Sequence, residues 1–217
     1  YSDITTDGQS IASLYISQNS TPSVFSNITY TNAPSPYQLF AQTTIPAIIT
    51  SNDTFGTGLV AKYQRISGTL SSGTHTLAAN PLGASTVWYM YADLTVPSGA
   101  TLDIDANTVI KSSNNFDLFV DGTLNVNGTP NNEVIFTDFR DDTVAGDSND
   151  DTNGSAPGIS NWEGIDFRPG SQGTVNSLIV QHVQEGVLVQ NTGSISAPLN
   201  FTDLTINNGV NGLRIYQ

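Results

Sequence analysis

The sequence lacks cysteine entirely and contains only six lysine and arginine residues in 217. Without disulfides, stability must come from strand ladders and stacked side chains. The few cations stand against 19 Asp and Glu, which gives a formal net charge of −13. Nucleic acid and anionic membrane surfaces both require a cationic patch, so neither is expected as a partner. Cations are the natural complement of this chain.

Helical periodicity and long apolar runs are also missing. No stretch of ten or more residues combines helical spacing with caps, so almost no helix is expected. No signal peptide or membrane-spanning run is present, and the chain opens at Tyr1 rather than methionine, so we expect a processed or excised segment without membrane insertion. There is no phosphate-binding loop, nucleophile triad or zinc-ligand spacing. The abundance of Thr, Ser, Asn and Gly with little Lys fits an extracellular protein.

What the chain does contain is a short strand pattern that returns every 22 to 26 residues. Three segments begin with glycine and carry apolar residues at alternate positions: 164–167, 186–189 and 212–215. Upstream, 102–104 matches 124–126 at an offset of 22, and 178–180 matches 204–206 at an offset of 26. Such a period is typical of a solenoid, in which alternation sends one face of each strand inward.

The fixed offset selects between two all-β folds. A β-sandwich also uses short strands and Gly-rich turns, but gives successive segments no reason to match at a constant spacing. A parallel β-helix does, because each coil stacks in register on the previous one. We therefore predict one right-handed parallel β-helix domain over residues 1–217, with regular coils in 66–217 and a loop insertion at 138–160. Residues 1–65, interrupted by prolines, are predicted to form irregular coils or a side-packed elaboration.

Five segments carry a resemblance to a known family: 94–105, 108–111, 118–129, 134–137 and 161–165. Together they resemble the secreted bacterial and archaeal right-handed β-helix proteins of the pectate-lyase-like superfamily. They are most similar to non-catalytic surface proteins of this type, in which a coil with a Val-Pro-Gly turn precedes an Asp-rich insertion and a Trp-Gly-Ile strand. The match covers roughly residues 68–190 and implies architecture more than activity.

The Asp-rich insertion is the densest group of candidate ligands. Residues 138–154 hold six Asp with Arg140 as the only cation, and such crowding is repulsive unless a cation or full solvation compensates. Asp147, Asn149 and Asp151 have the alternate spacing of a calcium loop, although Thr152 and Gly158 depart from the EF-hand pattern. We predict a Ca²⁺ site with five ligands: Asp141, Asp142, Asp147, Asn149 and Asp151. The alternative is a solvated, mobile acidic loop.

Enzymes of the resembling superfamily suggest a different use of carboxylates. Asp103 and Asp105 share the outward face of one strand, so a catalytic pair is geometrically conceivable. Outward Asp residues are also what a solvated strand face needs, and the six cations are scattered singly, whereas a polyuronate-cleaving groove requires a cluster. No catalytic residue is therefore predicted. Aromatic residues at 88, 89, 91 and 162 form either a sugar-stacking platform or core, and core is favoured for Trp162.

The two ends of the chain resemble each other. Residues 1–18 can be laid on 201–217 at an offset of 199 to 200. This match is either a coincidence between two coils or a sign that the chain is one period of a tandem array.

We expect a structural extracellular module of a repetitive cell-surface fibre or adhesin, stabilised by Ca²⁺ and stacked end to end on identical or homologous modules. The alternative is a carbohydrate-active β-helix that binds or cleaves polysaccharide, and surface glycans are possible partners. Six Asn-x-Ser/Thr sequons suit a glycoprotein, although an Asn- and Thr-rich chain also generates them by chance: Asn19, Asn27, Asn52, Asn127, Asn153 and Asn200.

Overall fold

The computed structural model describes five short N-terminal strands and residues 63–81, 86–190 and 199–216. Every regular element among these residues is a β-strand, and none of them forms a helix long and apolar enough to cross a membrane. The strands are β1 (Thr5–Asp7), β2 (Leu14–Ile16), β3 (Thr29–Thr31), β4 (Tyr37–Leu39), β5 (Thr54–Phe55), β6 (Tyr63–Thr69), β7 (Gly73–Leu77), β8 (Val87–Val96), β9 (Ala100–Asp105), β10 (Val109–Ser112), β11 (Asp117–Val120), β12 (Thr123–Asn127), β13 (Val134–Asp138), β14 (Gly164–Phe167), β15 (Gln172–Gln181), β16 (Gly186–Gln190), β17 (Leu199–Asn207) and β18 (Leu213–Tyr216).

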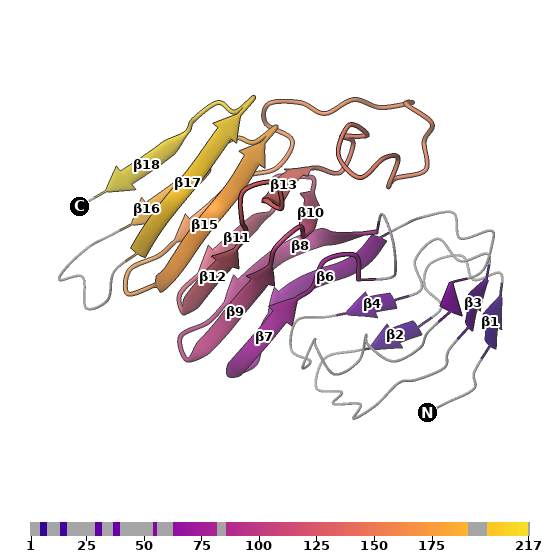
Figure 1. The fold of residues 1–217 in the computed structure, drawn as a ribbon, viewed down its shortest axis with the longest axis horizontal. Helices are drawn as coiled ribbons and strands as arrows, with labels where there is room; N and C mark the ends of the chain where they lie inside the picture. The colour runs from indigo at the N-terminus through magenta and orange to yellow at the C-terminus, as the bar shows by residue number, and fades with distance from the viewer. Residues whose placement is uncertain are drawn as a thin grey trace.

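All pairings between these strands are parallel, and the strands from β6 onward stack into three columns (Figure 1). The first column contains β7, β9, β12 and the first halves of β15 and β17. The second contains the first halves of β6 and β8, then β10, β13 and the second halves of β15 and β17. The third contains the ends of β6 and β8, then β11, β14, β16 and β18. The chain is therefore a parallel β-solenoid, as predicted.

The register also follows the sequence offsets. Leu102 pairs with Leu124, Leu178 pairs with Leu204, and Ile165 pairs with Val187, which pairs in turn with Leu213. Because side chains alternate between faces, a one-residue slip would turn each apolar column to solvent, so the apolar pattern specifies this register strongly.

The described strands before residue 63 are also parallel rungs. β1, β3 and β5 form a separate three-stranded sheet, while β2 and β4 lead into the second column through the Gln38–Arg65 pair. The rest of the segment predicted as irregular coils or elaboration lies outside the described residues. β2 matches β18 in sequence, yet β2 joins the second column and β18 the third. The match between the chain ends therefore does not mark equivalent places in the coil.

The core is a narrow tube of inward-facing side chains. Trp88 and Trp162 are almost completely buried, and the Trp162 ring stacks on Phe136 with centroids 6.0 Å apart. The indole N–H groups donate to the carbonyl oxygens of Ala78 and Gln181 at 2.8 and 3.0 Å, which satisfies their only polar atoms. Tyr89 is buried as well, and of the aromatics considered for a sugar platform only Tyr91 is exposed. The core interpretation of Trp162 is confirmed.

Close stacking of the coils requires glycine at particular rungs. Gly173 has a φ of +153°, and a Cβ built there would lie 1.9 Å from the carbonyl oxygen of Leu124 in the neighbouring coil. A Cβ at Gly212, by contrast, would meet nothing within 4 Å. A side chain can therefore be accommodated at position 212 but not at position 173 without a shift of the backbone.

Gly173→Ala is expected to lower the free energy of unfolding by about 1–3 kcal/mol, since the backbone must shift away from Leu124. Gly212→Ala is the matched control and should change it by less than about 0.5 kcal/mol, as for an ordinary surface substitution. Urea denaturation of both variants measures the difference. Equal stabilities would contradict the close coil spacing at Gly173.

Candidate cation site and acidic pocket

The Asp-rich insertion leaves the solenoid at the end of β13 and returns at β14 (Figure 1). Asp138, the last residue of β13, is fully buried and organises this exit. Its carboxylate accepts hydrogen bonds from the Arg140 backbone and guanidinium at 2.9 and 3.0 Å, from the Gly158 N–H at 3.2 Å and from the Asn161 side chain. One buried carboxylate thus joins both ends of the insertion.

Asp141 attaches the insertion to the second column. Its buried carboxylate accepts hydrogen bonds from Thr137 and Gln181, both at 2.7 Å, and from Thr143. Burial alone would raise the pKa of Asp141, but these hydrogen bonds favour the charged form and hold the pKa below its usual value. The carboxylate of Asp141, which was predicted as a metal ligand, is therefore hydrogen-bonded to residues of the solenoid itself.

Lys111 lies beneath the insertion and is completely buried. Its Nζ donates to the carbonyl oxygens of Asp141 at 2.8 Å and Gly146 at 3.1 Å. Burial lowers the pKa of Lys111 to about 8, against the opposing effect of nearby carboxylates, of which Asp141 is the strongest. The lysine therefore ties the insertion to β10 through backbone carbonyls.

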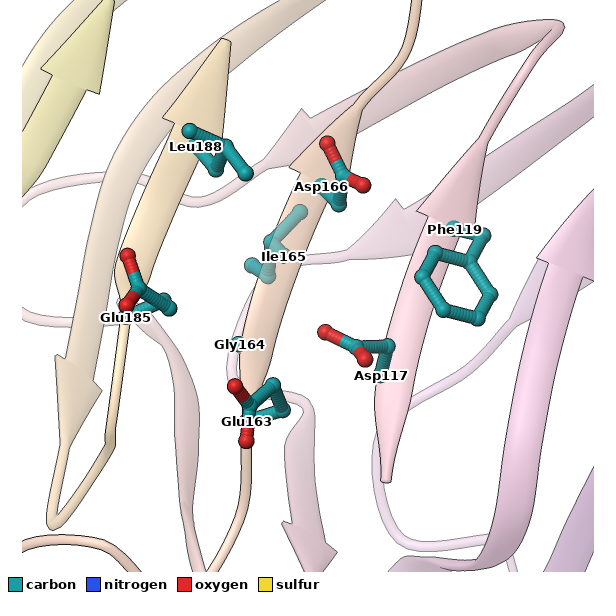
Figure 2. A pocket seen from close by; sticks show the side chains of 8 residues that line it. All are labelled: Asp117, Phe119, Glu163, Gly164, Ile165, Asp166, Glu185 and Leu188. Carbon is teal, nitrogen blue, oxygen red and sulfur yellow. The ribbon is translucent and has the colours of Figure 1, made fainter. Parts of the chain in front are cut away.

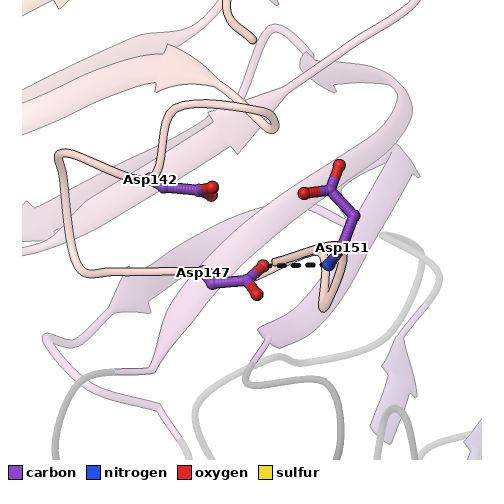
Figure 3. Close-up of side chains that lie close together, drawn as sticks. All are labelled: Asp142, Asp147 and Asp151. Atoms are coloured by element: carbon purple, nitrogen blue, oxygen red, sulfur yellow. Dashed lines mark hydrogen bonds between the residues drawn. The ribbon is translucent and has the colours of Figure 1, made fainter. Parts of the chain in front are cut away.

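Three of the predicted ligands do come together. Asp142, Asp147 and Asp151 each place a carboxylate oxygen within 4.8 Å of the others, and Figure 3 shows the Asp142 carboxylate pointing toward the other two. Asp147 also accepts hydrogen bonds from the N–H groups of Asp151 and Thr152, at 3.1 and 2.9 Å. Asn149 lies beside them, because its Nδ2 donates to Asp151 at 3.0 Å.

The electrostatics of this cluster are unequal. Burial, together with the charges of Asp147 and Asp151, raises the pKa of Asp142. The pKa of Asp151 is lowered, chiefly by the hydrogen bond from Ser155. Two oxygens in the group, Asp142 Oδ1 and Asn149 Oδ1, are buried and have no hydrogen-bond partner. Oxygen donors without partners, in a set free of His and Cys, are suited to a hard cation.

A second acidic site lies on the outer face of the third column. Asp117 pairs with Gly164, and Gly164 with Gly186, so two successive coils lack a side chain beside Asp117. The resulting pocket has a volume of about 160 Å³ (Figure 2). Its walls combine apolar and acidic side chains: Phe119, Ile165, Leu188, Asp117, Glu163, Asp166 and Glu185.

Several carboxyl groups of this pocket have a raised pKa, because they are partly buried and lie close to other carboxylates. Burial, followed by the charges of Glu163 and Asp93, raises the pKa of Asp117 to about 7. Burial also raises the pKa of Glu163 and of Asp166. Two of the carboxylates that line the pocket have an arginine partner. Arg168 approaches Asp166 at 3.6 Å, and Arg214 contacts Glu185 at 2.5 Å.

Asp103 was considered from the sequence as one half of a catalytic carboxylate pair. In the structure it accepts a hydrogen bond at 2.8 Å from the side-chain amide of Asn125, which lies opposite it in the next coil. Sequence reasoning missed the acidic pocket, although the recurring glycines at 164 and 186 were visible. What it lacked was the register that sets Asp117 opposite those glycines.

Comparison with known proteins identifies no relatives. No family model matches the chain, and neither a curated protein nor a solved structure matches it significantly.

Lys111→Met is expected to loosen the insertion, because the buried carbonyl oxygen of Asp141 and the partly buried one of Gly146 lose their donor. An unsatisfied buried group costs about 1–3 kcal/mol, so the free energy of unfolding should fall by at least that amount. Limited proteolysis should cut between β13 and β14 faster than in the wild type. Unchanged cleavage would show that Lys111 does not hold the insertion.

Asp117 is expected to make the solenoid less stable as the pH rises from about 4 to about 7. Its folded-state pKa of about 7 lies above the unfolded value of about 3.9, so in this window the folded state keeps a proton that the unfolded chain has released. Asp117→Asn should flatten the pH dependence of urea denaturation. Asp105→Asn, which removes an exposed carboxylate elsewhere, should not. Identical profiles for wild type and Asp117→Asn would contradict the assignment.

Proposed function

We propose that this chain is a structural module of an extracellular surface fibre or adhesin, which stacks end to end on identical or homologous modules. The observation that carries the proposal is the apolar face at the C-terminal end of the solenoid. Val187 and Val189 are 0% and 8% exposed, whereas Leu213 and Ile215, their partners in the last described coil, are 45% and 60% exposed.

The same face continues across the other columns. Phe201, Leu204 and Ile206 pack against the core from one side, and β17 and β18 have a strand partner on one side only among the described residues. Such an end presents apolar core and unpaired strand edges together, and solenoids cap or stack this surface. A further parallel coil is the occupant that would satisfy both features at once.

The proposal has three further parts, which are the handedness of the coil, the extracellular setting and the family. A right-handed coil agrees with the strong preference for right-handed connections between parallel strands. An extracellular setting agrees with a composition rich in Thr, Ser, Asn and Gly and poor in Lys, and with three exposed sequon residues, Asn127, Asn153 and Asn200. Membership of the pectate-lyase-like superfamily, in its surface-protein type, is proposed from the motif resemblance alone.

A carbohydrate-active protein is the second candidate, and the acidic pocket favours it. A carboxyl group with a pKa near 7, such as Asp117, is suited to general-acid chemistry. The described cations, however, do not form a cluster that could hold a polyanionic substrate. Lys111 is buried, Arg65 lies over the Tyr91 ring, and Arg140, Arg168 and Arg214 contact carboxylates. Release of reducing ends from neutral polysaccharides, lost in Asp117→Asn, would favour this candidate over the structural one.

Ile215→Asp is expected to abolish self-association, because it places a charge on the exposed apolar end. Ile159→Asp is the matched control, since Ile159 is 56% exposed in the insertion, away from that end. Sedimentation velocity over a range of concentrations should show oligomers for the wild type and the control, and monomers for Ile215→Asp. A wild type that stays monomeric throughout, or a control that dissociates equally, would overturn end-to-end stacking of identical modules.

A further inference from the structure

The sequence match between the two ends of the chain has no role within a single copy. Residues 1–18 match residues 201–217 at an offset of 199 to 200, yet β2 joins the second column and β18 the third. Figure 1 shows β1 and β2 at the opposite end of the structure from β17 and β18. The matching strands can therefore meet only between two copies of the chain.

Adjoining coils of this solenoid place similar residues on each other. In the core, Val187 pairs with Leu213, and on the outer face Asp103 pairs with Asn125. The similarity follows from the parallel ladder, because residues of one column share the same face and the same surroundings. A coil that continued the solenoid beyond β17 and β18 should therefore resemble them in sequence.

β1 and β2 have that resemblance. Leu14 and Ile16 of β2 match the exposed Leu213 and Ile215 of β18 at an offset of 199. The Thr-Thr-Asp sequence of β1 matches Thr-Ile-Asn at the end of β17 at an offset of 200. The match places no like charges on each other, since an Asp aligns with an Asn and Tyr15 aligns with Arg214.

The connections between the strands agree with the match. Residues 8–13 join β1 to β2, and residues 208–212 join β17 to β18. The first connection is one residue longer, which accounts for the change of offset from 200 to 199. Both strands of the N-terminal pair can thus align with both strands of the C-terminal pair in one arrangement.

The strand edges at the two ends are also complementary. Among the described residues, β1 and β2 pair only with β3 and β4, while β17 and β18 pair only with β15 and β16. Because successive coils advance in one direction, the free edges at the two ends face opposite ways along the axis. A parallel ladder between two copies would satisfy the unpaired backbone groups of both edges.

We propose that β1 and β2 of one copy extend the coil of β17 and β18 of its neighbour, with the second copy turned by one column about the long axis. The turn follows because β2 belongs to the second column of its own copy but matches the third-column strand β18. The arrangement rests on the proposed function, which requires end-to-end stacking but specifies neither the partner strands nor the turn. Such a heterologous contact does not close into a dimer, so it builds an open filament.

A stack without the turn is the main structural alternative. It would set β2 on the second half of β17, since both belong to the second column, and Leu14 and Ile16 would align with Leu204 and Ile206. β1 would then lose its match, because the two halves of β17 form one continuous strand whereas residues 8–13 separate β1 from β2. Only the turned stack accommodates both N-terminal strands.

The lack of cysteine allows a direct test by disulfide cross-linking. Aligned residues of neighbouring strands lie about 4.8 Å apart, which is within the Cα separation of about 4.4–6.8 Å that a disulfide spans. Tyr15→Cys mixed with Arg214→Cys should form a covalent dimer in oxidised glutathione, because the turned stack aligns these positions. Tyr15→Cys mixed with Thr205→Cys is the matched control, aligned only in the stack without the turn, and should cross-link at least about tenfold less.

Ile215→Asp, added to the Arg214→Cys chain, should abolish the cross-link, which separates stacking from random collision. Equal cross-linking of the two mixtures, or a preference for Thr205→Cys, would overturn the turned arrangement. Covalent dimers of Arg214→Cys alone would overturn it as well, since like ends would then meet. If neither mixture cross-links while the wild type sediments as oligomers, the arrangement is wrong and the proposed function stands. A wild type that stays monomeric overturns both.

Discussion

The in-register stacking of inward apolar side chains is the constraint on which the whole structure depends. Each buried position, such as Ile165, rests on its counterpart one coil away, Val187, and the parallel ladder keeps that spacing constant. A chain without disulfides has this repeated contact as its main source of cohesion. The interaction is local between neighbouring coils, so it fixes the rod without dictating what the outer faces carry.

Stacking also imposes a cost on the outside, because like positions lie about 4.8 Å apart in successive coils. A repeated Asp would build a column of repelling charges. The chain avoids this by following Asp103 with Asn125, and Asp117 with Gly164. At Asp117 the avoidance is incomplete, since Glu163 adds charge beside the glycine and helps to raise the pKa of Asp117. The acidic pocket is a direct product of this arrangement.

The candidate cation site was only partly predictable. The density of Asp in residues 138–154 located the loop, and Asp142, Asp147 and Asp151 do meet. Asp141 was expected to share their role, and its carboxylate is instead hydrogen-bonded to Thr137, Thr143 and Gln181. Its orientation could not be predicted, because neighbours in an irregular loop have no fixed side-chain direction. Its hydrogen bond to Gln181 spans 40 residues of sequence, and no local pattern contains that contact. Asp138 and Lys111, which hold the loop in place, were likewise not distinguished from ordinary charged residues.

The sequence by itself determined the solenoid, its register and its buried columns, because alternation and a period near 22 residues are local signals that every coil repeats. Tertiary structure alone decided which carboxylates are paired with scaffold donors, which remain without partners, and where glycines leave a pocket. Those outcomes depend on side chains from different coils meeting across the ladder. They also depend on burial, which sets whether a charge is solvated by water or must find a partner within the protein.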